Sequence, residues 1–261
     1  MEPLGLAKES SKVFVAATTA CFAHLPLETA LTRLADLEYS WVEIMIHESE
    51  GHLKPSQVYA HLDEAIRICR NTHRLTPVAY SVDIESPEPL YYEQFAACCR
   101  LAKATKVATI TIRASELGTP FNAEIERLRK MAAIAALEGV VLGLHTEVGR
   151  MTEDPTTAIV LCQQVKGLCL TLDPSHYIYS PHRGANLEPL IKYTCHVRLR
   201  DTRKDKFQVR VGQGEVEYGK LITLLQKYDY NRALCVDIRP MPDVDQNVEL
   251  RKMRLLLESL L

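Results

Sequence analysis

Short runs of β-forming residues alternate with longer amphipathic segments along the whole chain, and this alternation limits the fold more than any other feature. Strands are predicted over 13–22, 41–47, 77–84, 107–115, 140–147, 168–173, 195–201 and 233–240. Apolar residues at helical spacing predict helices over 25–39, 54–73, 90–106, 122–139, 155–167, 187–193, 217–230 and 245–261. Eight strand–helix units of roughly 32 residues each predict a (β/α)8 TIM barrel, with residues 1–261 as its single domain.

An open, doubly wound α/β sheet is the alternative arrangement of such units. That fold carries a glycine-rich phosphate-binding turn after its first strand in nucleotide-binding proteins. Neither GxGxxG nor GxxxxGK[ST] follows the segment 13–22, and no linker or low-complexity tract divides the chain. The sequence therefore favours the closed barrel.

Composition narrows the range of partners and compartments. A net charge of −2 provides no overall positive field to attract nucleic acid. No apolar run reaches the roughly 18 residues that a membrane span requires, and the first residues, MEPLGLAKESSK, do not resemble a secretory signal. The eight cysteines fall inside apolar segments, which is typical of buried free thiols in a reducing compartment. We therefore expect a cytoplasmic protein with neither nucleic-acid nor membrane partners.

Polar residues gather at the predicted ends of the strands, where TIM barrels carry their chemistry. Alternate residues of a strand point inward, so residues of one parity share the barrel interior. On this parity small or apolar residues lead up to a polar tip. The resulting candidates are His47, Arg113, His145, Asp173, Arg198, Arg200 and Asp237.

The stretch TLDPSHYIYS, residues 171–180, ends a buried strand on Asp173, with His176 three residues later. The carboxylate either caps the following segment or joins His176 in holding a metal or a substrate. His145, Asp173, His176 and Asp237 together would form a set of two imidazoles and two carboxylates, which suits a divalent metal such as Zn²⁺ or Mn²⁺. Glu147 lies just past the fifth strand, where it could act as a base or as another ligand.

A basic segment follows the seventh strand. Between residues 192 and 210, seven lysines and arginines stand against two aspartates. Such a run forms either a solvated face or a grip for the phosphate or carboxylate of a small substrate. The GQGEVEY turn after it would let the backbone lie close to a ligand.

These features together resemble the xylose isomerase-like TIM barrels, a family of sugar and sugar-phosphate isomerases and epimerases with relatives among metal-dependent AP endonucleases. The resemblance covers most of the chain. The motifs that carry it are PLETALTRLADLEYSWVEIMI, GVVLGLHTEVG, LTLDPSHYI, HVRLRDT and GQGEVEYGKLITLLQKYDYNRALCVDI, in this order.

The resemblance implies one divalent metal held by a Glu ending strand five, an Asp ending strand six, a His on strand seven and a Glu ending strand eight. Asp173 matches the strand-six ligand, and His176 matches a nearby His that often contacts substrate or metal. The other positions depart from the family: His145, Arg198 and Asp237 stand where the Glu, His and Glu are expected. Arg198 is the serious departure, because a guanidinium stays protonated and cannot ligate a metal. A divalent metal (Mn, Zn or Mg) and a metal-free site are therefore equally consistent with the sequence.

The resemblance also implies an isomerase or epimerase that moves a proton next to a carbonyl of a sugar, sugar phosphate or keto acid. Glu147, Asp237 and His176 are the candidate catalytic residues. Arg198, Arg200, Arg113, His47 and His176 are the candidate substrate-binding residues. A lyase or dehydratase that shares the first step, and a metal-free barrel that only binds ligands, remain alternatives. Barrels of this family often pair, so a homodimer is also expected.

Overall fold

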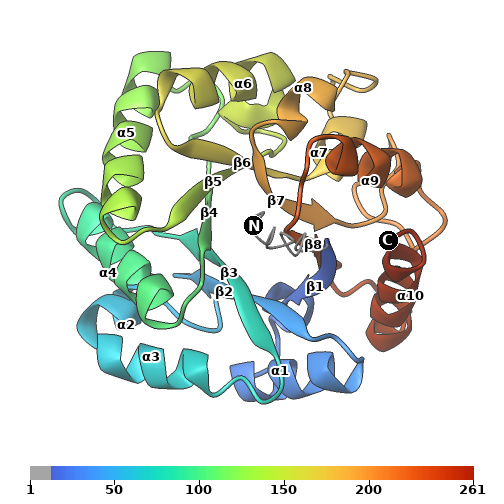
Figure 1. The fold of residues 1–261 in the computed structure, drawn as a ribbon, viewed down its shortest axis with the longest axis horizontal. Coiled ribbons are helices and arrows are strands. Elements are labelled where there is room, and N and C mark those ends of the chain that lie inside the picture. Colours follow the sequence, from blue (N-terminus) through green and yellow to red (C-terminus); the bar gives the residue numbers. More distant parts are fainter. Residues whose placement is uncertain (1–12) are drawn as a thin grey trace, which may run out of the picture.

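Eight parallel strands close into a barrel in sequence order, within the residues 13–261 that the computed structural model describes (Figure 1). The closed barrel confirms the predicted fold class. The strands are β1 (Phe14–Thr18), β2 (Trp41–His47), β3 (Thr76–Asp83), β4 (Thr109–Arg113), β5 (Val141–His145), β6 (Leu168–Leu172), β7 (Thr194–Leu199) and β8 (Ala233–Val236).

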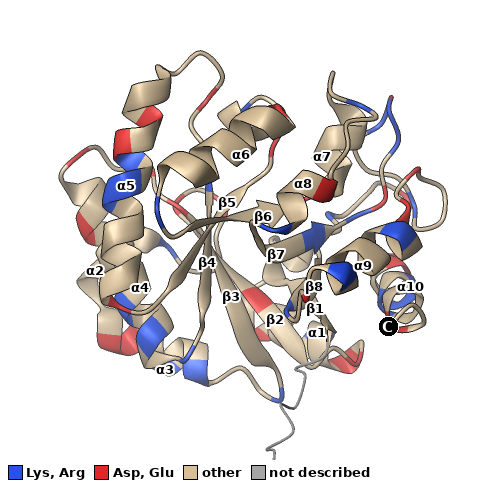
Figure 2. Ribbon diagram, turned by 45° about the horizontal axis from the view of Figure 1, so that its top comes forward, with Lys and Arg blue, Asp and Glu red and all other residues tan. Residues whose placement is uncertain are grey.

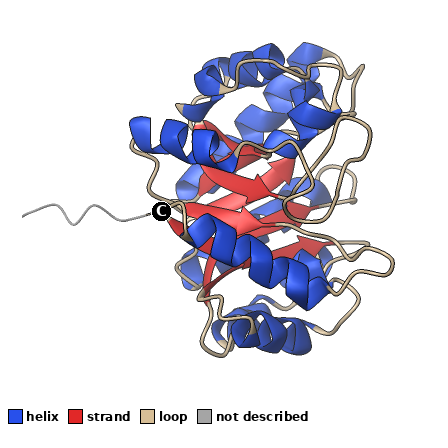
Figure 3. Cartoon of the chain, turned by 90° about the vertical axis from the view of Figure 1, so that its right-hand side faces the viewer, coloured by secondary structure: helices blue, strands red, loops and turns tan. Residues whose placement is uncertain are grey.

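Helices surround the barrel, as the side view shows (Figure 3). They are α1 (Leu27–Asp36), α2 (Pro55–Ala60), α3 (Leu62–Arg70), α4 (Leu90–Ala104), α5 (Phe121–Leu137), α6 (Pro155–Gln164), α7 (Pro174–Tyr179), α8 (Glu188–Ile191), α9 (Tyr218–Lys227) and α10 (Gln246–Glu258). Two short 3-10 turns, η1 (Thr19–Phe22) and η2 (Met151–Glu153), follow β1 and β5. The apolar face of each longer helix packs against the strands, and in α4 Phe95 and Leu101 are fully buried.

The elements differ most from the sequence prediction in three places. The first predicted strand, 13–22, is strand only to Thr18 and then turns as η1. The helix predicted over 54–73 is broken at His61 into α2 and α3. The sequence did not predict α7, which begins at Pro174 directly after β6.

The barrel interior changes from apolar to charged along its axis. Ala16, Ala233 and Cys235 pack together in a small apolar cluster inside the strands. Ala16 is paired with Trp41 of β2. Two residues further along β2, Glu43 is fully buried and contacts Arg198 of β7. The charged layers above it lead to the carboxyl ends of the strands, so the charges inside the barrel face one mouth.

Lysines, arginines and acidic residues are also scattered over the outer helices and loops (Figure 2). The eight cysteines are unpaired, and all of them except Cys169 are buried. None of the helices between residues 13 and 261 is both long and apolar enough to cross a membrane.

Candidate active site

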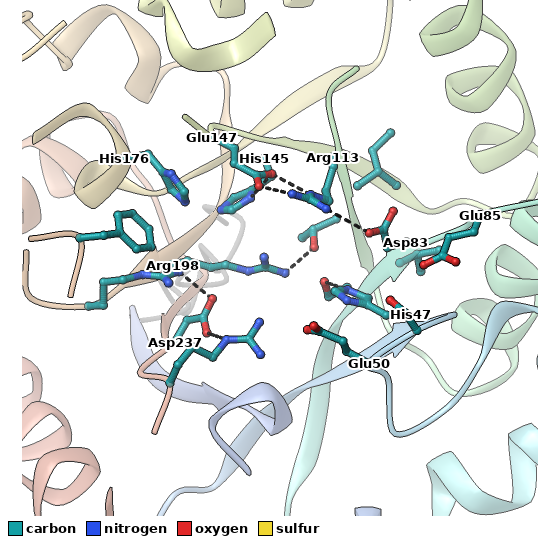
Figure 4. A pocket seen from close by; sticks show the side chains of 18 residues that line it. His47, Glu50, Asp83, Glu85, Arg113, His145, Glu147, His176, Arg198 and Asp237 are labelled. Atoms are coloured by element: carbon teal, nitrogen blue, oxygen red, sulfur yellow. Dashed lines mark hydrogen bonds and ion pairs between the residues drawn. The ribbon is translucent and has the colours of Figure 1, made fainter. Parts of the chain in front are cut away.

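A cavity of about 410 Å³ opens at the carboxyl ends of the strands (Figure 4). Charged and polar side chains from all parts of the barrel line it, which fits the rule that barrel strands present their chemistry at this end. Most of the predicted site residues are among them: His47, Arg113, His145, Glu147, His176, Arg198, Arg200 and Asp237. Asp173 is fully buried behind this lining and contacts several of its members.

Asp173 has two different roles at the end of β6. It is the N-cap of α7: Oδ1 accepts the backbone N–H of Ser175 at 3.0 Å and also the Ser175 hydroxyl. Pro174 occupies the first turn of this helix, where its missing N–H costs nothing. The second oxygen, Oδ2, points to the site and accepts from Arg200. The sequence DPSH therefore both caps a helix and supplies a buried carboxylate.

Arg200 lies between the carboxylates that end β6 and β8. Its Nη2 donates to Asp173 Oδ2 at 2.9 Å and to Asp237 Oδ2 at 2.8 Å. The ring of Phe207 covers the guanidinium, with Cζ 4.8 Å from the ring centroid. Burial alone would raise the pKa of Asp173 and Asp237, but Arg200 outweighs it and holds both pKa values well below their ordinary range. Both carboxylates are therefore ionised.

Arg198 lies one layer deeper, at the floor of the cavity. Its Nη2 donates to Glu43 Oε1 at 2.7 Å and to Thr111 Oγ1 at 2.8 Å. His196 Nε2 is 2.8 Å from the other oxygen of Glu43. Burial by itself would raise the pKa of Glu43, yet Arg198 and His196 lower it to about 2. Arg198 therefore balances a buried charge inside the barrel and reaches the cavity from below.

Glu147 is held by Arg113 on the opposite wall from Asp237 (Figure 4). Arg113 Nε donates to Glu147 Oε2 at 2.9 Å, and Nη2 pairs with Oε1 in a bidentate contact. The remaining nitrogen, Nη1, donates to Asp83 Oδ2 at 3.3 Å. Burial opposes ionisation of Glu147, but His145 and Arg113 keep its pKa well below the ordinary range.

His145 stands between two carboxylates. Its Nδ1 is 3.5 Å from Glu147 Oε2, and its Nε2 is 3.7 Å from Asp173 Oδ2. Burial favours the neutral imidazole, but the two carboxylates outweigh it and raise the pKa of His145 above the ordinary value. This imidazole therefore keeps its proton to higher pH than a free histidine does.

His176 and His47 have the opposite behaviour. Burial lowers the pKa of each to about 3, so both are neutral near pH 7. His176 Nδ1 accepts the backbone N–H of Val148 at 3.1 Å. The proton of the neutral ring must then lie on Nε2, the nitrogen that is 3.7 Å from Asp173 Oδ2. His47 Nε2 lies 2.8 Å from the Ser81 hydroxyl.

The four residues proposed as metal ligands do not fit a divalent cation in this arrangement. A metal bound to both Asp173 and Asp237 would need the space that Arg200 Nη2 fills, since metal–oxygen bonds are about 2 Å long. His176 accepts a hydrogen bond at Nδ1, so its proton is on Nε2 and that nitrogen cannot ligate a metal. In a histidine that ligates a metal, the nitrogen away from the metal normally carries the proton and donates a hydrogen bond. His145, Asp173 and His176 do gather within ligand spacing, but beside the Arg200 charge. A second such group, Glu43, His196 and Cys235, is already neutralised by Arg198.

The sequence did not single out several residues that shape the site. Arg239 Nε is 3.3 Å from Asp237 Oδ1, and Asp83 and Phe207 contact Arg113 and Arg200. Arg239 follows Asp237 at the same parity, which is the signal that would have identified it. Asp83 ends β3 at the parity of Ala79 and Ser81, so the same signal marks it. Phe207 comes from a loop, so no strand pattern marks it.

The basic segment and the glycine-rich turn after it are mainly structural. Its exposed members point to solvent: Lys192, Arg203, Lys204, Lys206 and Arg210. The backbone N–H groups of Gly212 and Gly214 donate to Asp201 Oδ2 at 2.8 and 2.9 Å. A Cβ on Gly214 would lie 1.9 Å from Asp201 Oδ1, so this glycine allows close approach of a buried carboxylate of the chain itself.

Comparisons with known proteins agree with this architecture. Three matching structures are a 3-keto-D-glucoside 4-epimerase from Escherichia coli (TM-score 0.73, 13% identity, 95% of this chain and 100% of that one), a probable 3-DHS dehydratase from Bacillus anthracis (0.71, 14%, 94% and 99%), and the IOLI protein with a bound zinc atom (0.68, 16%, 95% and 96%). At these identities the likeness shows a shared fold. No curated protein matches the sequence. The family model of the xylose isomerase-like TIM barrel matches residues 31–256, so the chain belongs to that family.

Proposed function

We propose that this protein is an isomerase or epimerase that moves a proton next to the carbonyl of a sugar or sugar acid. One observation carries the proposal: two ionised carboxylates, Glu147 after β5 and Asp237 after β8, stand on separate walls of one cavity that also holds guanidinium groups (Figure 4). Inversion at a carbon requires a proton acceptor on one face of the substrate and a donor on the other. The structural neighbours include epimerases of sugars, which supports this class of reaction.

The steps follow from the charges of the site. A carboxylate, Glu147 or Asp237, removes the proton from the carbon beside the carbonyl, and the C–H electron pair moves into the carbonyl to form an enediolate. A guanidinium next to the developing oxyanion stabilises it, because this charge is fixed in place and largely shielded from water. For isomerisation the same carboxylate returns its proton to the neighbouring carbon. For epimerisation Asp237 takes the proton on one face, and His145, which keeps a proton beside Glu147, supplies one through Glu147 to the opposite face; proton exchange with solvent then restores both groups.

The histidines would orient the substrate and manage its hydroxyl protons. His145 keeps a proton through its two carboxylate neighbours, so it is suited to donate a hydrogen bond or a proton. His176 presents Nε2–H toward Asp173 from the edge of the cavity. Arg113 is a positioning residue here, because all three of its donating nitrogens hold Glu147 and Asp83.

Deuterium exchange tests the proposal directly. The protein would be incubated in D2O with a panel of ketoses, sugar phosphates and keto sugar acids, and NMR would follow deuterium entering the carbon beside the carbonyl. We expect exchange and a product of unchanged formula. At least one of Glu147→Gln and Asp237→Asn should abolish exchange, whereas Glu116→Gln, at a side chain that is 79% exposed, should not. Lack of exchange across the whole panel would count against the proposal.

A dehydratase is the second candidate, since one structural neighbour is a probable dehydratase and the first step would be the same. The enediolate would then expel a hydroxide from the adjacent carbon in place of taking back the proton. The same NMR experiment separates the two reactions. A product that has lost one water would establish the dehydratase and refute the isomerase.

A further inference from the structure

The geometry points to Arg200 as the cation of this active site: we propose that its guanidinium occupies the place of the divalent metal and that the protein works without one. The inference rests on the proposed function only for the identity of the oxyanion. Its structural part, that the site does not bind a divalent cation, can be tested separately.

The position of Arg200 is fixed from three sides. Nη2 bridges Asp173 Oδ2 and Asp237 Oδ2 at 2.9 and 2.8 Å, and Phe207 covers the plane of the guanidinium. The residue is 5% exposed. Two ionised aspartates that converge on one point form a strong cation site, and here a nitrogen of the protein itself takes that point. The cation is therefore covalently part of the chain.

Arg200 keeps a donor for a ligand. Across residues 13–261 no protein atom accepts a hydrogen bond from Nη1 of Arg200 or from Nη1 of Arg198, and both residues line the cavity. A substrate oxyanion in the cavity can thus accept from either guanidinium. One guanidinium carries half the charge of a divalent metal. Arg198, two residues earlier, offers a second hydrogen-bond donor, while Glu43 balances its charge.

The imidazole of His176, on the other side of Asp173, independently supports the conclusion that the site does not bind a metal. His176 offers N–H, not a lone pair, toward Asp173, because its Nδ1 is engaged by the backbone N–H of Val148. A histidine arranged to ligate a metal has the reverse pattern, with its second nitrogen donating. The hydrogen bonding of His176 is thus that of a donor to an anion.

Metal binding by the untagged full-length protein tests the inference without any substrate. Metal content would be measured by mass spectrometry after purification, and Zn²⁺ and Mn²⁺ binding by calorimetry. We expect no stoichiometric ion in the wild type. Arg200→Met releases both aspartates and removes the charge, so Zn²⁺ should bind at least roughly tenfold more tightly. Arg200→Lys keeps the charge and should gain no affinity.

Arg239→Met is the matched control, because it removes another guanidinium that contacts Asp237 without lying between the two aspartates. It should not gain Zn²⁺ affinity. About one ion per wild-type chain, or equal affinity in wild type and Arg200→Met, would overturn the inference. The wild-type measurement decides even where Arg200→Met does not fold. A metal-free protein that is inactive on the substrate panel would refute the proposed reaction and leave this inference standing.

Discussion

Removing both partners of the buried pair between Glu43 and Arg198 should destabilise the barrel much less than the sum of the two single removals. Glu43 is completely buried, accepts from Arg198 Nη2 at 2.7 Å and lies 2.8 Å from His196 Nε2. Arg198→Met leaves this carboxylate without its main partner, and Glu43→Gln leaves a buried guanidinium without an anion. In the double variant no uncompensated charge remains.

Two estimates of the cost agree. Breaking a buried ion pair by removing one partner typically costs about 3–5 kcal/mol of unfolding free energy. Independently, the pKa of Glu43 falls from the ordinary 4.5 to about 2, which corresponds to about 3 kcal/mol of interaction with its surroundings. For a chain of this size about 3 kcal/mol lowers the melting temperature by roughly 6–12 °C. We expect each single variant to lose this much.

The double variant Glu43→Gln/Arg198→Met should lose at least about 2 kcal/mol less than the sum of the single losses, since the interaction is then removed as a unit. Urea unfolding followed by circular dichroism measures all four proteins. The surface pair Lys103–Glu138, at 2.9 Å with Lys103 61% exposed, is the control and should show less than about 1 kcal/mol of coupling. Additive losses in the buried pair would refute the argument that charge compensation holds this layer together.

Three other perturbations test local features. Stability should fall as pH decreases from about 6.5 to about 3. In this range the histidines of the unfolded chain take up protons, whereas folded His47 and His176, whose pKa is about 3, do not. A urea midpoint that stays constant across this range would contradict the conclusion that burial keeps these two histidines neutral. Gly143→Ala should lower the free energy of unfolding by about 1–3 kcal/mol, since its Cβ would lie 2.5 Å from Thr171 Oγ1. Gly219→Ala, where the nearest atom lies 4.0 Å from the added Cβ, is the control and should leave the melting temperature nearly unchanged. Asp201→Asn should speed hydrogen exchange in residues 202–215, because the carboxylate holds three backbone N–H groups of that loop. Unchanged exchange would mean that the loop is ordered by other contacts.

The barrel itself was predictable because strand and helix periodicities are properties of short segments. The errors lie where one residue decides the outcome. Pro174 begins a six-residue helix after β6, too short to produce an amphipathic pattern. The break at His61 divides one apolar periodicity into two helices, and nothing in that periodicity marks it.

The composition of the site was predictable to the same degree, and its pairing was not. Strand parity correctly placed Arg198 and Arg200 on the inward face of β7, as their contacts with Glu43 and Asp173 show. Parity does not give depth, however. The two arginines differ by one layer along the barrel axis, and a long side chain chooses its partner in three dimensions. For that reason the sequence singled out Arg198, the residue at the expected ligand position, whereas Arg200 lies between the carboxylates.

Strand β7 places its inward charges in layers, and each layer is neutralised from different strands. Arg198 meets Glu43 from β2, and Arg200 meets the aspartates that follow β6 and β8. The lower pair separates the apolar bottom of the barrel from the cavity and holds β7 against β2 across the interior. Because the lower charge is already balanced, Arg200 cannot be drawn toward Glu43 and must satisfy the upper aspartates. The departure from the family at position 198 thus determines the arrangement at position 200, and a guanidinium between the two aspartates becomes a property of the fold that does not depend on metal supply.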